Sequence, residues 1–399
     1  MIGGGSRSQR PAIDYGRLSF MVVISVIFYN EFLVYFNVYR SWPTLRQHQL
    51  LKILLIADPQ IQGAHDMDNW VLGTITRWDS DRYLSKTFSW AKYAYNPDIV
   101  VFLGDLMDEG STGTDAEYRS YAVRFKSIYE TKAVKIYVAG DNDVGGEGSD
   151  PLTPEKVARF KKTFPSRPNF LFQLNGGQVV QRYELEEVEK YPLIEIVPAN
   201  VLTFKTSEET WFGVDRELHP KVKFRLVVSH MPILPGSSPT FSKEVMNYLK
   251  PSLIFSAHDH RGVDYSTTRV FKGRPFGNVT IFTQRHAEED EEPEVIRVHG
   301  EDQGIHEIIV PTCSYRMGVK EMAIGIATID QDVGEITYHN LWLPSRFPLL
   351  YLYLAAVSIA STLFLIGRLK KRTRRASISS SGQRRRSSLR SNAHYSKLV

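Results

Sequence analysis

Five short apolar runs in this sequence each end at side chains that commonly bind metal ions. The runs lie at 52–57, 98–104, 134–140, 225–229 and 252–257. The side chains that follow them, in that order, are Asp58 and Gln60, then Asp105, then Asp141, Asn142 and Asp143, then His230, and finally His258 and His260. In open α/β sheets, ligands bind just outside the carboxyl ends of the strands. The repeated pattern therefore predicts one crevice that holds a site for two divalent cations.

The carboxylates are informative as a group rather than singly. One aspartate at a strand end is more often a helix cap or an ion-pair partner, and a lone histidine is more often a core residue. A crevice that holds Asp58, Asp105 and Asp141 together would be destabilised without cations, because histidines offset carboxylates only when they are protonated. Two cations about 3.5–4 Å apart would supply that charge, generate a hydroxide from water and neutralise phosphoryl oxygens. Oxygen and nitrogen ligands suit manganese, which we expect here, with zinc or iron as alternatives.

The order of the motifs resembles that of the calcineurin-like metallophosphoesterase superfamily, whose usual pattern is D-x-H, G-D, G-N-H-D, H and G-H-x-H. The resemblance covers residues 52 to about 340. It implies a two-sheet β-sandwich flanked by helices, the four-layer αββα form of an α/β fold. The implied ligands are Asp58, Gln60 and His260 for the first metal, Asp105 as the bridge, and Asp141, His230 and His258 for the second metal. The residues implied for catalysis are Asn142, Asp143 and His230.

Two positions depart from the usual superfamily pattern. Gln60 stands where a histidine is usual, and its neutral amide oxygen should weaken the first metal site. Asn142 stands where G-N-H-D has its histidine, and asparagine can donate a hydrogen bond but delivers no proton at pH 7. The general acid is therefore unassigned; His65 is one option, although a surface position is the simpler interpretation. A register shift of one residue would make Asn142 the ligand and Asp143 its support, but the ungapped alignment favours Asp141.

Four longer segments are similar to one branch of the superfamily, the fungal Ted1 and Cdc1 proteins and mammalian PGAP5. They are ADPQ (57–60), GDLMDEG (104–110), GDNDVGGEG (140–148) and VPTCSYRMG (310–318), and the GDNDVGG form resembles the Ted1 members most. This branch implies removal of ethanolamine phosphate from a mannose of the glycosylphosphatidylinositol (GPI) anchor, which supports transport of GPI-anchored proteins from the endoplasmic reticulum to the Golgi. We expect the second mannose to be the site.

Two alternative functions follow from the same residues. The enzyme could act on the first mannose, as Cdc1-type members do, or on another phosphodiester. A non-catalytic module that recognises GPI-linked cargo is the other alternative, and it is motivated by Asn142. The expected partners are a GPI-anchored glycolipid or protein and, in the transport role, the cargo-export machinery.

Two apolar stretches bracket the predicted domain. Residues 347–367 carry no charge over 21 positions, and as a helix they would reach about 31 Å, close to the roughly 30 Å of a bilayer core. A buried core helix is the rival interpretation there. Residues 18–38 are interrupted by Asn30 and Glu31, and a cleaved signal peptide is the rival, although no A-x-A-like site follows. We expect both stretches to be transmembrane helices.

Charge predicts how the chain is oriented in the membrane. Residues 368–399 contain eleven Lys or Arg and no Asp or Glu, so subtracting them from the formal net charge of +5 leaves −6 for residues 1–367. A basic segment beside a span marks the cytosolic side. We therefore expect a cytosolic N-terminus (1–17), a lumenal domain (40–346) and a basic, disordered cytosolic tail (368–399), in the membrane of the endoplasmic reticulum or early Golgi. Nucleic-acid binding is disfavoured, because the basic region and the ordered domain then lie on opposite sides.

The remaining patterns predict the elements that position the ligands. Residues 81–95 and 115–132 have the mixed apolar and charged spacing of amphipathic helices. The runs at 278–284, 306–311, 323–330 and 335–339 are strand-like and predict a second sheet packed on the first. The acidic stretch 286–304 predicts a solvated loop. Asn278 begins a glycosylation sequon, and the single cysteine, Cys313, excludes an internal disulfide framework.

Overall fold

A computed structural model describes most of the chain between residues 14 and 395. The described residues are 14–45, 50–65, 70–165, 167, 170–175, 178–182, 193–199, 222–235, 241–242, 245–267, 282–286, 294–297, 305–330 and 335–395. The chain divides into two compact units, one made of Met1–Asn37 and Arg346–Val399 and the other of Val38–Ser345. The larger unit contains all the expected metal ligands. Asn278 lies outside the described residues.

The first sheet of the larger unit has six strands in the order β11-β14-β13-β1-β2-β3. Their bounds are Leu50–Ile56 (β1), Ile99–Phe102 (β2), Val134–Tyr137 (β3), Glu294–Arg297 (β11), Ala323–Asp330 (β13) and Glu335–Trp342 (β14). Strands β1, β2 and β3 are parallel to one another, whereas β13 is antiparallel to β1 and to β14. Because β1, β2 and β3 are parallel, the residues that follow them lie at one edge of this sheet.

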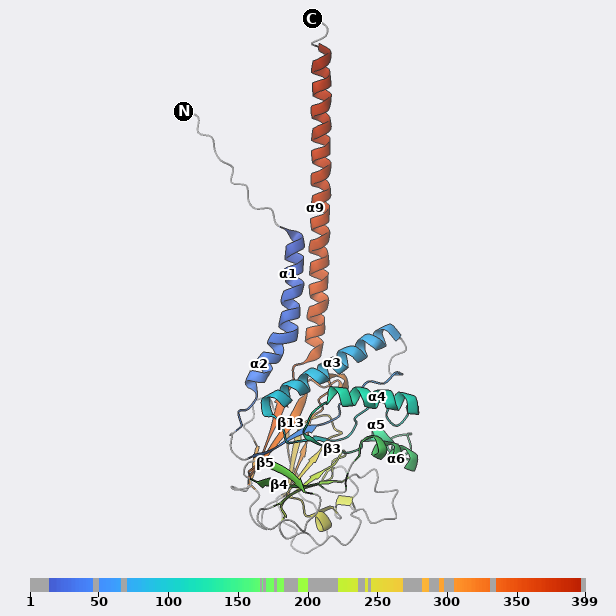
Figure 1. The fold of residues 1–399 in the computed structure, drawn as a ribbon, viewed down its shortest axis with the longest axis vertical. Coiled ribbons are helices and arrows are strands. Elements are labelled where there is room, and N and C mark those ends of the chain that lie inside the picture. Colours follow the sequence, from blue (N-terminus) through green and yellow to red (C-terminus); the bar gives the residue numbers. More distant parts are fainter. Residues whose placement is uncertain are drawn as a thin grey trace, which may run out of the picture. The chain divides into compact units, whose positions relative to one another are not determined.

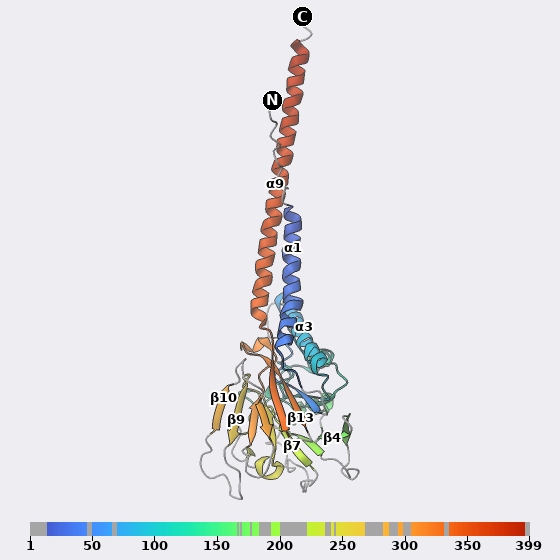
Figure 2. The same cartoon turned by 90° about the vertical axis from the view of Figure 1, so that its left-hand side faces the viewer.

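The second sheet has eight strands in the order β10-β9-β12-β8-β7-β6-β4-β5. Their bounds are Phe170–Asn175 (β4), Gln178–Arg182 (β5), Leu193–Pro198 (β6), Val222–Val228 (β7), Leu253–Ser256 (β8), Val263–Thr267 (β9), Phe282–His286 (β10) and His306–Ile309 (β12). Strands β6, β7, β8 and β12 are parallel, and the outer pairs are antiparallel. The turned view displays the sheet from β10 and β9 at one edge to β4 near the other (Figure 2).

The late strands are distributed differently from our expectation. β13 and β14 extend the first sheet beyond β1 and do not join the second, and β11 lies within the acidic stretch that we expected to be a loop. β13 buries Ile324 and Ile326 on one face and Ala327 and Ile329 on the other. A strand that is apolar on both faces suits the middle of a covered sheet. Position along the chain does not reveal this, because the partner of β13 lies near the start of the domain.

The two sheets pack face to face, and helices cover the first one. Alternate residues of β1 serve the two layers: Ile53 and Leu55 lie in the core between the sheets, whereas Leu54 and Ile56 pack with residues of helices α3 (Trp70–Tyr95) and α4 (Asp115–Ile128). Figure 1 shows α3 and α4 side by side over this sheet. The prediction of two packed sheets flanked by helices is confirmed.

Short helices complete the outer layers of the domain. The outer face of the second sheet packs against residues from the π-helical turn η2 (Val245–Leu249) and its neighbours. α4 begins at a capping box, in which Thr114 and Glu117 each accept from the other's backbone N–H. Helix α5 (Asp141–Val144) begins directly after the strand end that carries the third set of expected ligands, and α6 (Pro154–Thr163) follows it.

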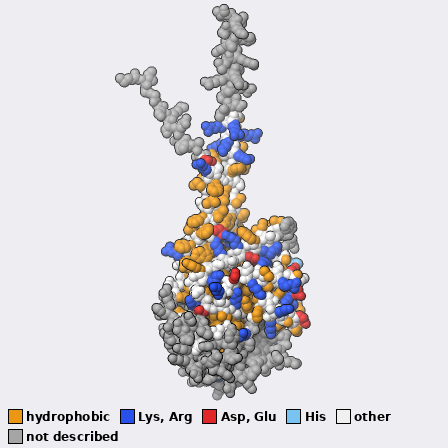
Figure 3. Space-filling view, viewed as in Figure 1, with side chains coloured by type: hydrophobic (Ala, Val, Ile, Leu, Met, Phe, Trp, Pro, Cys, Tyr) orange, Lys and Arg blue, Asp and Glu red, His pale blue; other side chains and the backbone are white. Residues whose placement is uncertain are grey.

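The smaller unit contains two apolar helices that lie side by side (Figure 1). The first runs through α1 (Tyr15–Phe28), the π-helical turn η1 (Tyr29–Leu33) and α2 (Val34–Ser41), and the second is α9 (Arg346–Tyr395). Tyr15–Ser41 and Arg346–Ala376 are long and apolar enough to cross a membrane. Apolar side chains cover the helix pair, and a group of Lys and Arg side chains follows this apolar band (Figure 3).

Asn30 and Glu31, which interrupt the first apolar run, are buried in η1. Asn30 Nδ2 donates to the carbonyl oxygen of Leu349 at 2.9 Å, and the Tyr353 hydroxyl donates to Glu31 Oε1 at 2.6 Å. A nitrogen of Arg346 lies 3.9 Å from the same Glu31 oxygen. The polar residues therefore link the two helices, as polar side chains between apolar helices commonly do.

Helix α9 continues to Tyr395, whereas we expected a disordered tail from residue 368. The physical reason lies in the composition of residues 368–395, which contain no proline and a single glycine, Gly382. Arginine and lysine are good helix formers, and elongation of an existing helix avoids the cost of nucleation.

Candidate metal centre

Both sheets contribute to the predicted crevice. The residues that follow β1, β2 and β3 come from the first sheet, and those that follow β7 and β8 come from the second. Two groups of possible ligand atoms, each within 4.8 Å of one another, form there: Asp141 with His230 and His258, and Asp58 with Asp105 and His230. His230 belongs to both groups, so the two clusters are adjacent. The five strand ends therefore meet at one place.

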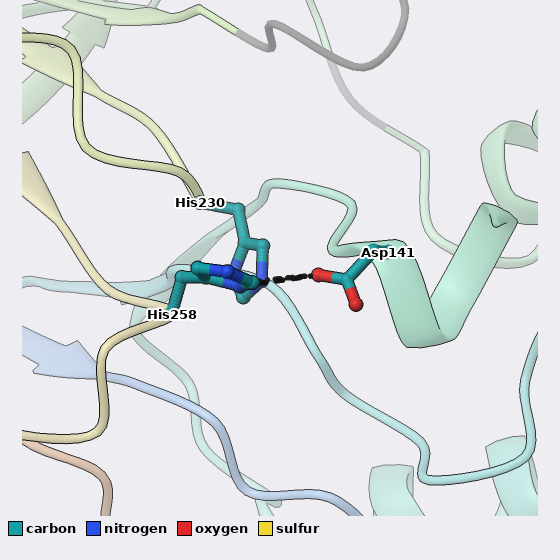
Figure 4. A group of neighbouring side chains, drawn as sticks. All are labelled: Asp141, His230 and His258. Atoms are coloured by element: carbon teal, nitrogen blue, oxygen red, sulfur yellow. Dashed lines mark hydrogen bonds and ion pairs between the residues drawn. The ribbon is translucent and has the colours of Figure 1, made fainter. Parts of the chain in front are cut away.

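The first cluster joins three side chains from three strand ends. His230 Nε2 lies 3.0 Å from Asp141 Oδ1, and His258 Nδ1 lies 3.2 Å from His230 Nε2 and 3.3 Å from the same Asp141 oxygen. The three side chains point toward one another (Figure 4). One carboxylate oxygen and two imidazole nitrogens that converge in this way suit a divalent transition metal.

The orientation of His230 leaves one of its nitrogens available to a cation. Its Nδ1 lies 2.8 Å from the carbonyl oxygen of Leu103, which can only accept a hydrogen bond. Nδ1 therefore carries a proton, and in the neutral ring Nε2 keeps its lone pair. Metal-binding histidines commonly have this arrangement, in which the second ring nitrogen donates to a carbonyl oxygen.

The second cluster contains the ligands expected for the first metal. Gln60 Nε2 lies 3.1 Å from Asp105 Oδ2 and 3.4 Å from His260 Nε2, and His260 Nε2 lies 4.0 Å from Asp58 Oδ1. Asp105 Oδ1 also lies 3.4 Å from His230 Nε2, so Asp105 stands between the two clusters as a bridging ligand would. Both carboxylate oxygens of Asp58 are buried without a hydrogen-bond partner among the described residues. A cation would stabilise buried carboxylate oxygens of this kind, so these residues fit a metal site.

The charges of the two clusters are strongly coupled. Burial raises the pKa of Asp58 to about 7, against the opposing effect of the positive charge on His230, and burial also raises the pKa of Asp105. Burial alone would lower the pKa of His230, but the charge of Asp105, with contributions from Asp141 and Asp58, raises it to about 10. In the protein without metal, a proton on His230 therefore offsets part of the carboxylate charge. Divalent cations would offset that charge more completely.

The backbone is strained at the expected ligands. Among the described residues, seven non-glycine positions have a positive φ. Five of these are expected ligands: Asp58 (45°), Gln60 (41°), Asp105 (50°), His258 (73°) and His260 (62°). Left-handed backbone costs about 1–2 kcal/mol for an ordinary residue. Strain of this kind concentrates at functional sites, where surrounding contacts maintain it.

Two glycines allow the loops to approach one another closely. A Cβ on Gly140 would lie 2.0 Å from Asp105 Oδ1, and a Cβ on Gly104, whose φ is 98°, would lie 2.4 Å from His230 Nδ1. Any other residue at either position would displace an expected ligand.

Asn142 and Asp143 support the ligands from behind. The Asn142 backbone N–H donates to Asp105 Oδ1 at 3.0 Å, and its side-chain nitrogen donates to Asp105 Oδ2 at 2.7 Å. Asp143 is buried and accepts from the backbone N–H groups of Gly140, Leu106 and Met107. Asp141, and not Asp143, belongs to one of the two groups of possible ligands. Asp141 as the ligand fits this arrangement, and the choice between Asp141 and Asn142 stays a prediction.

His65 lies at the surface. Its Nε2 is 2.8 Å from Glu117 Oε1, and its side chain is 73% exposed. This position agrees with the surface interpretation of His65. In the described part of the chain, its side chain contacts Glu117 and not an expected ligand.

Sequence reasoning missed Glu147. A hydrogen bond with Asp141 raises the pKa of its carboxyl group, together with burial. Glu147 lies in an exposed loop in which Gly145, Gly146 and Gly148 have positive φ. The glycine spacing in GDNDVGGEG was the available signal, because it indicates a loop that folds back over the preceding residues.

Comparison with known proteins places these residues in a family. Residues 51–262 match the calcineurin-like phosphoesterases (Metallophos). This match covers more than half of the chain and includes every residue that we expected to bind a metal.

Three curated relatives are similar to the chain over different lengths. Metallophosphoesterase 1 of Danio rerio is 25% identical over 296 residues, which is 62% of this chain and 74% of that protein. Cell division control protein 1 of Saccharomyces cerevisiae is 21% identical over 317 residues, 73% of this chain and 58% of that protein. The metallophosphoesterase 1 homolog of Caenorhabditis elegans is 28% identical over 153 residues, but the chain spans only 40% of its length.

Among solved structures, a purple acid phosphatase from yellow lupin (Lupinus luteus) seeds is similar to the chain at 12% identity and a TM-score of 0.42. The similarity covers 75% of this chain and 53% of the lupin chain.

Proposed function

The chain belongs to the calcineurin-like phosphoesterase family and is a metal-dependent phosphoesterase, and on that premise we propose that it cleaves ethanolamine phosphate from a mannose of the GPI anchor. This proposal rests on the pair of adjacent ligand clusters that share His230, with Asp105 between them. A phosphodiester that reaches this crevice meets ligands for two cations, which is the arrangement used for in-line displacement at phosphorus.

The choice of substrate rests on the spelling of the motifs. DPQ after β1, GDND after β3 and the segment 310–318 are similar to the branch that acts on GPI anchors. Similarity to cell division control protein 1 and to metallophosphoesterase 1 supports this choice. We propose the second mannose as the site, with the first mannose as the alternative. The GPI-anchored protein or glycolipid is the expected partner, and its export to the Golgi is the process that would depend on the reaction.

The two apolar helices support a membrane-bound enzyme. We propose that residues 18–38 and 347–367 span the membrane of the endoplasmic reticulum or early Golgi, that 40–346 are lumenal and that both termini are cytosolic. A GPI anchor is itself embedded in lipid, so an anchored enzyme and its substrate would share one membrane surface. The basic side chains that follow the second span support a cytosolic C-terminus.

The residues divide the work of the site. Asp58, Gln60, Asp105 and His260 would hold one cation, and Asp141, His230, His258 and the shared Asp105 would hold the other. We propose manganese, with zinc or iron as alternatives. When bound, the two cations would supply hydroxide at neutral pH and neutralise charge on the phosphoryl oxygens.

Hydrolysis also requires a proton for the oxygen that leaves phosphorus. The oxygen of water bonds to phosphorus, the bond between phosphorus and the mannose oxygen breaks, and that oxygen gains a proton. Asn142 cannot deliver this proton, because an amide does not ionise near neutral pH. Its two hydrogen bonds to Asp105 assign it instead to orienting the bridging carboxylate.

The test is mass spectrometry of GPI glycans from cells that lack the protein, complemented with the wild-type chain or with Asp105→Ala. We expect ethanolamine phosphate to be retained on the second mannose in the deletion and in Asp105→Ala, and to be removed by the wild type. Retention on the first mannose would support the alternative site. Glycans that are identical in all three strains would refute the GPI assignment.

A further inference from the structure

The segment 310–318 runs beside the metal centre but supplies none of its expected ligands. It includes the short 3₁₀ turn η3 (Tyr315–Met317) and follows β12. The sequence of this segment is similar to the branch of the superfamily that acts on GPI anchors, yet the proposed chemistry gives the segment no role. Its contacts show what it does.

Thr312 joins two ligand loops that come from different sheets. Its side-chain hydroxyl donates to the backbone carbonyl oxygen of Asp58 at 3.0 Å, and its backbone N–H donates to the carbonyl oxygen of His260 at 3.3 Å. Thr312 also forms an isolated parallel bridge with Ala57, and the next residue, Cys313, donates its N–H to Ala57 at 3.0 Å. Thr312 is fully buried, so these bonds are shielded from water.

Arg316 holds the loop that contains Asp58 at a second point, the carbonyl group of Gln60. Its Nη1 donates to the backbone carbonyl oxygen of Gln60 at 3.0 Å, and its Nη2 donates to Asp108 Oδ2 at 3.0 Å. The side chain of Arg316 is only 14% exposed. A guanidinium that is fixed at both Nη1 and Nη2 has a defined direction, so it holds the Gln60 carbonyl in place rather than merely attracting it.

These bonds act where the backbone is strained. Asp58, Gln60 and His260 have φ values of 45°, 41° and 62°. A left-handed residue turns its carbonyl oxygen away from the direction it takes in a strand or a helix. A donor that meets the turned oxygen offsets part of the cost of the strained conformation. Thr312 and Arg316 provide such donors for the carbonyls of all three residues.

The second cluster is held by other contacts. The carbonyl oxygen of Asp141 accepts from the N–H of Gly145 at 2.6 Å, and that of His230 accepts from the N–H of Ala257 at 2.9 Å. Neither of these two bonds involves Thr312 or Arg316. The two clusters therefore differ in what keeps their ligands in position.

We propose that Thr312 and Arg316 are positioning residues that hold the backbone of Asp58, Gln60 and His260 in the conformation needed for binding of the first cation. The inference rests on the proposed division of ligands between two cations, and it adds that this segment controls the affinity of one cation and not of the other. Loss of either residue should weaken the first site selectively. A role limited to general stability would affect both sites or neither.

The first arm of the test uses Thr312. Mn²⁺ binding to the detergent-purified full chain is measured by calorimetry and by electron paramagnetic resonance. Each site is measured alone, the first in a His258→Ala background and the second in a His260→Ala background. We expect Thr312→Val to weaken the first site about tenfold, within the range typical of residues that support metal ligands, and to change the second site less than twofold.

Matched variants separate the hydroxyl from its surroundings. Thr312→Ser keeps the hydroxyl and should restore the first site to within about threefold of the wild type. Ser314→Ala removes a buried hydroxyl of the same segment whose oxygen has no hydrogen-bond partner in the described part of the chain, so it should leave both sites unchanged. In the wild-type chain loaded with Mn²⁺, magnetic coupling between the two ions should appear in the electron paramagnetic resonance spectrum. Thr312→Val should reduce this coupling at limiting Mn²⁺.

The second arm uses Arg316 and decides the outcome. Arg316→Met should weaken the first site, and Arg316→Lys should do so less, because one ammonium group can reach the Gln60 carbonyl without the second anchor on Asp108. Wild-type affinity at the first site in both Thr312→Val and Arg316→Met would overturn the proposal, and so would equal weakening of both sites. These readouts need no turnover. A chain that binds two Mn²⁺ normally but leaves the GPI glycan uncut would refute the proposed function alone.

Discussion

The side-chain nitrogen of Asn142 donates to Asp105 Oδ2 at 2.7 Å, while its backbone N–H donates to Oδ1 of the same carboxylate at 3.0 Å. One residue thus fixes both oxygens of the carboxylate that lies between the two ligand clusters. The relationship explains how asparagine serves at a position where the superfamily usually has histidine. It keeps the geometry of the bridge and has no proton to transfer.

Asn142→Ala should lower kcat and the affinity for metal by about 10- to 100-fold, because it removes one of the two bonds by which Asn142 orients Asp105. The pH–rate profile should keep its shape, since asparagine does not titrate. Steady-state rates at saturating Mn²⁺ between pH 5 and 9 provide the measurement. Asn142→His is the matched variant and should add a limb near pH 6.5. A limb that disappears in Asn142→Ala would mean that the residue takes part in proton transfer.

Asp58→Asn should abolish activity and yet stabilise the chelator-treated chain above pH 7. Burial raises the pKa of Asp58 from 3.8 to about 7, so the folded chain without metal retains a proton that the unfolded chain loses. Stability is therefore lost as pH rises through that window, and an amide avoids the loss. Thermal midpoints with excess chelator at pH 8 should rise by a few degrees. With Mn²⁺ added, the order should reverse, because only the wild type gains stability by binding it. A lower midpoint than the wild type without metal would contradict the raised pKa of Asp58.

Glu307→Gln should change how stability depends on pH. Glu307 is fully buried and accepts from the N–H groups of Ile233 and Leu234, and burial raises its pKa from 4.5 to about 7. The folded state binds the extra proton, so this contribution is present below pH 4.5 and is lost as pH rises through 7. The stability of the wild type relative to Glu307→Gln should fall by at most about 3 kcal/mol between pH 5 and pH 9.

The exposed Glu321 supplies the control for that measurement. Glu321→Gln should follow the wild type across the whole range of pH when thermal midpoints are compared. An identical pH dependence in Glu307→Gln would show that the buried carboxyl does not titrate in this interval.

Tyr353→Phe should loosen the helix pair of the smaller unit. The variant removes the hydroxyl that donates to Glu31 Oε1 at 2.6 Å and should cost about 1–2 kcal/mol, as polar contacts between membrane helices do. Disulfide formation between Ser19→Cys and Ala360→Cys reports the pairing, because the Ser19 hydroxyl donates to the Ala360 carbonyl at 2.8 Å. Cross-linking should be slower in Tyr353→Phe. Tyr351→Phe, at a position that is 69% exposed, should have no effect, and equal slowing by both variants would argue against the Glu31 contact.

The ligand positions could be predicted from the sequence because each is local to a strand end. Asp58, Asp105 and His230 each follow an apolar run directly, and parallel strands bring such ends together. The supporting contacts are not local. Thr312 and Asp58 are 254 residues apart, and no pattern near either residue indicates the bond. The place of β13 beside β1 was missed for the same reason, since pairing of distant strands depends on what covers both faces of the sheet.

Metal-dependent cleavage can be measured by hydrolysis of a mannose–ethanolamine phosphate diester by the detergent-purified chain while Mn²⁺ is added to the metal-free protein. Phosphorus resonance follows the release of phosphoethanolamine, and paramagnetic resonance follows the filling of the two sites. We predict no release without metal, release that appears as the second site fills, and none with Asp105→Ala. Two filled sites without release beyond that of Asp105→Ala would contradict cleavage of this diester by the two-metal site.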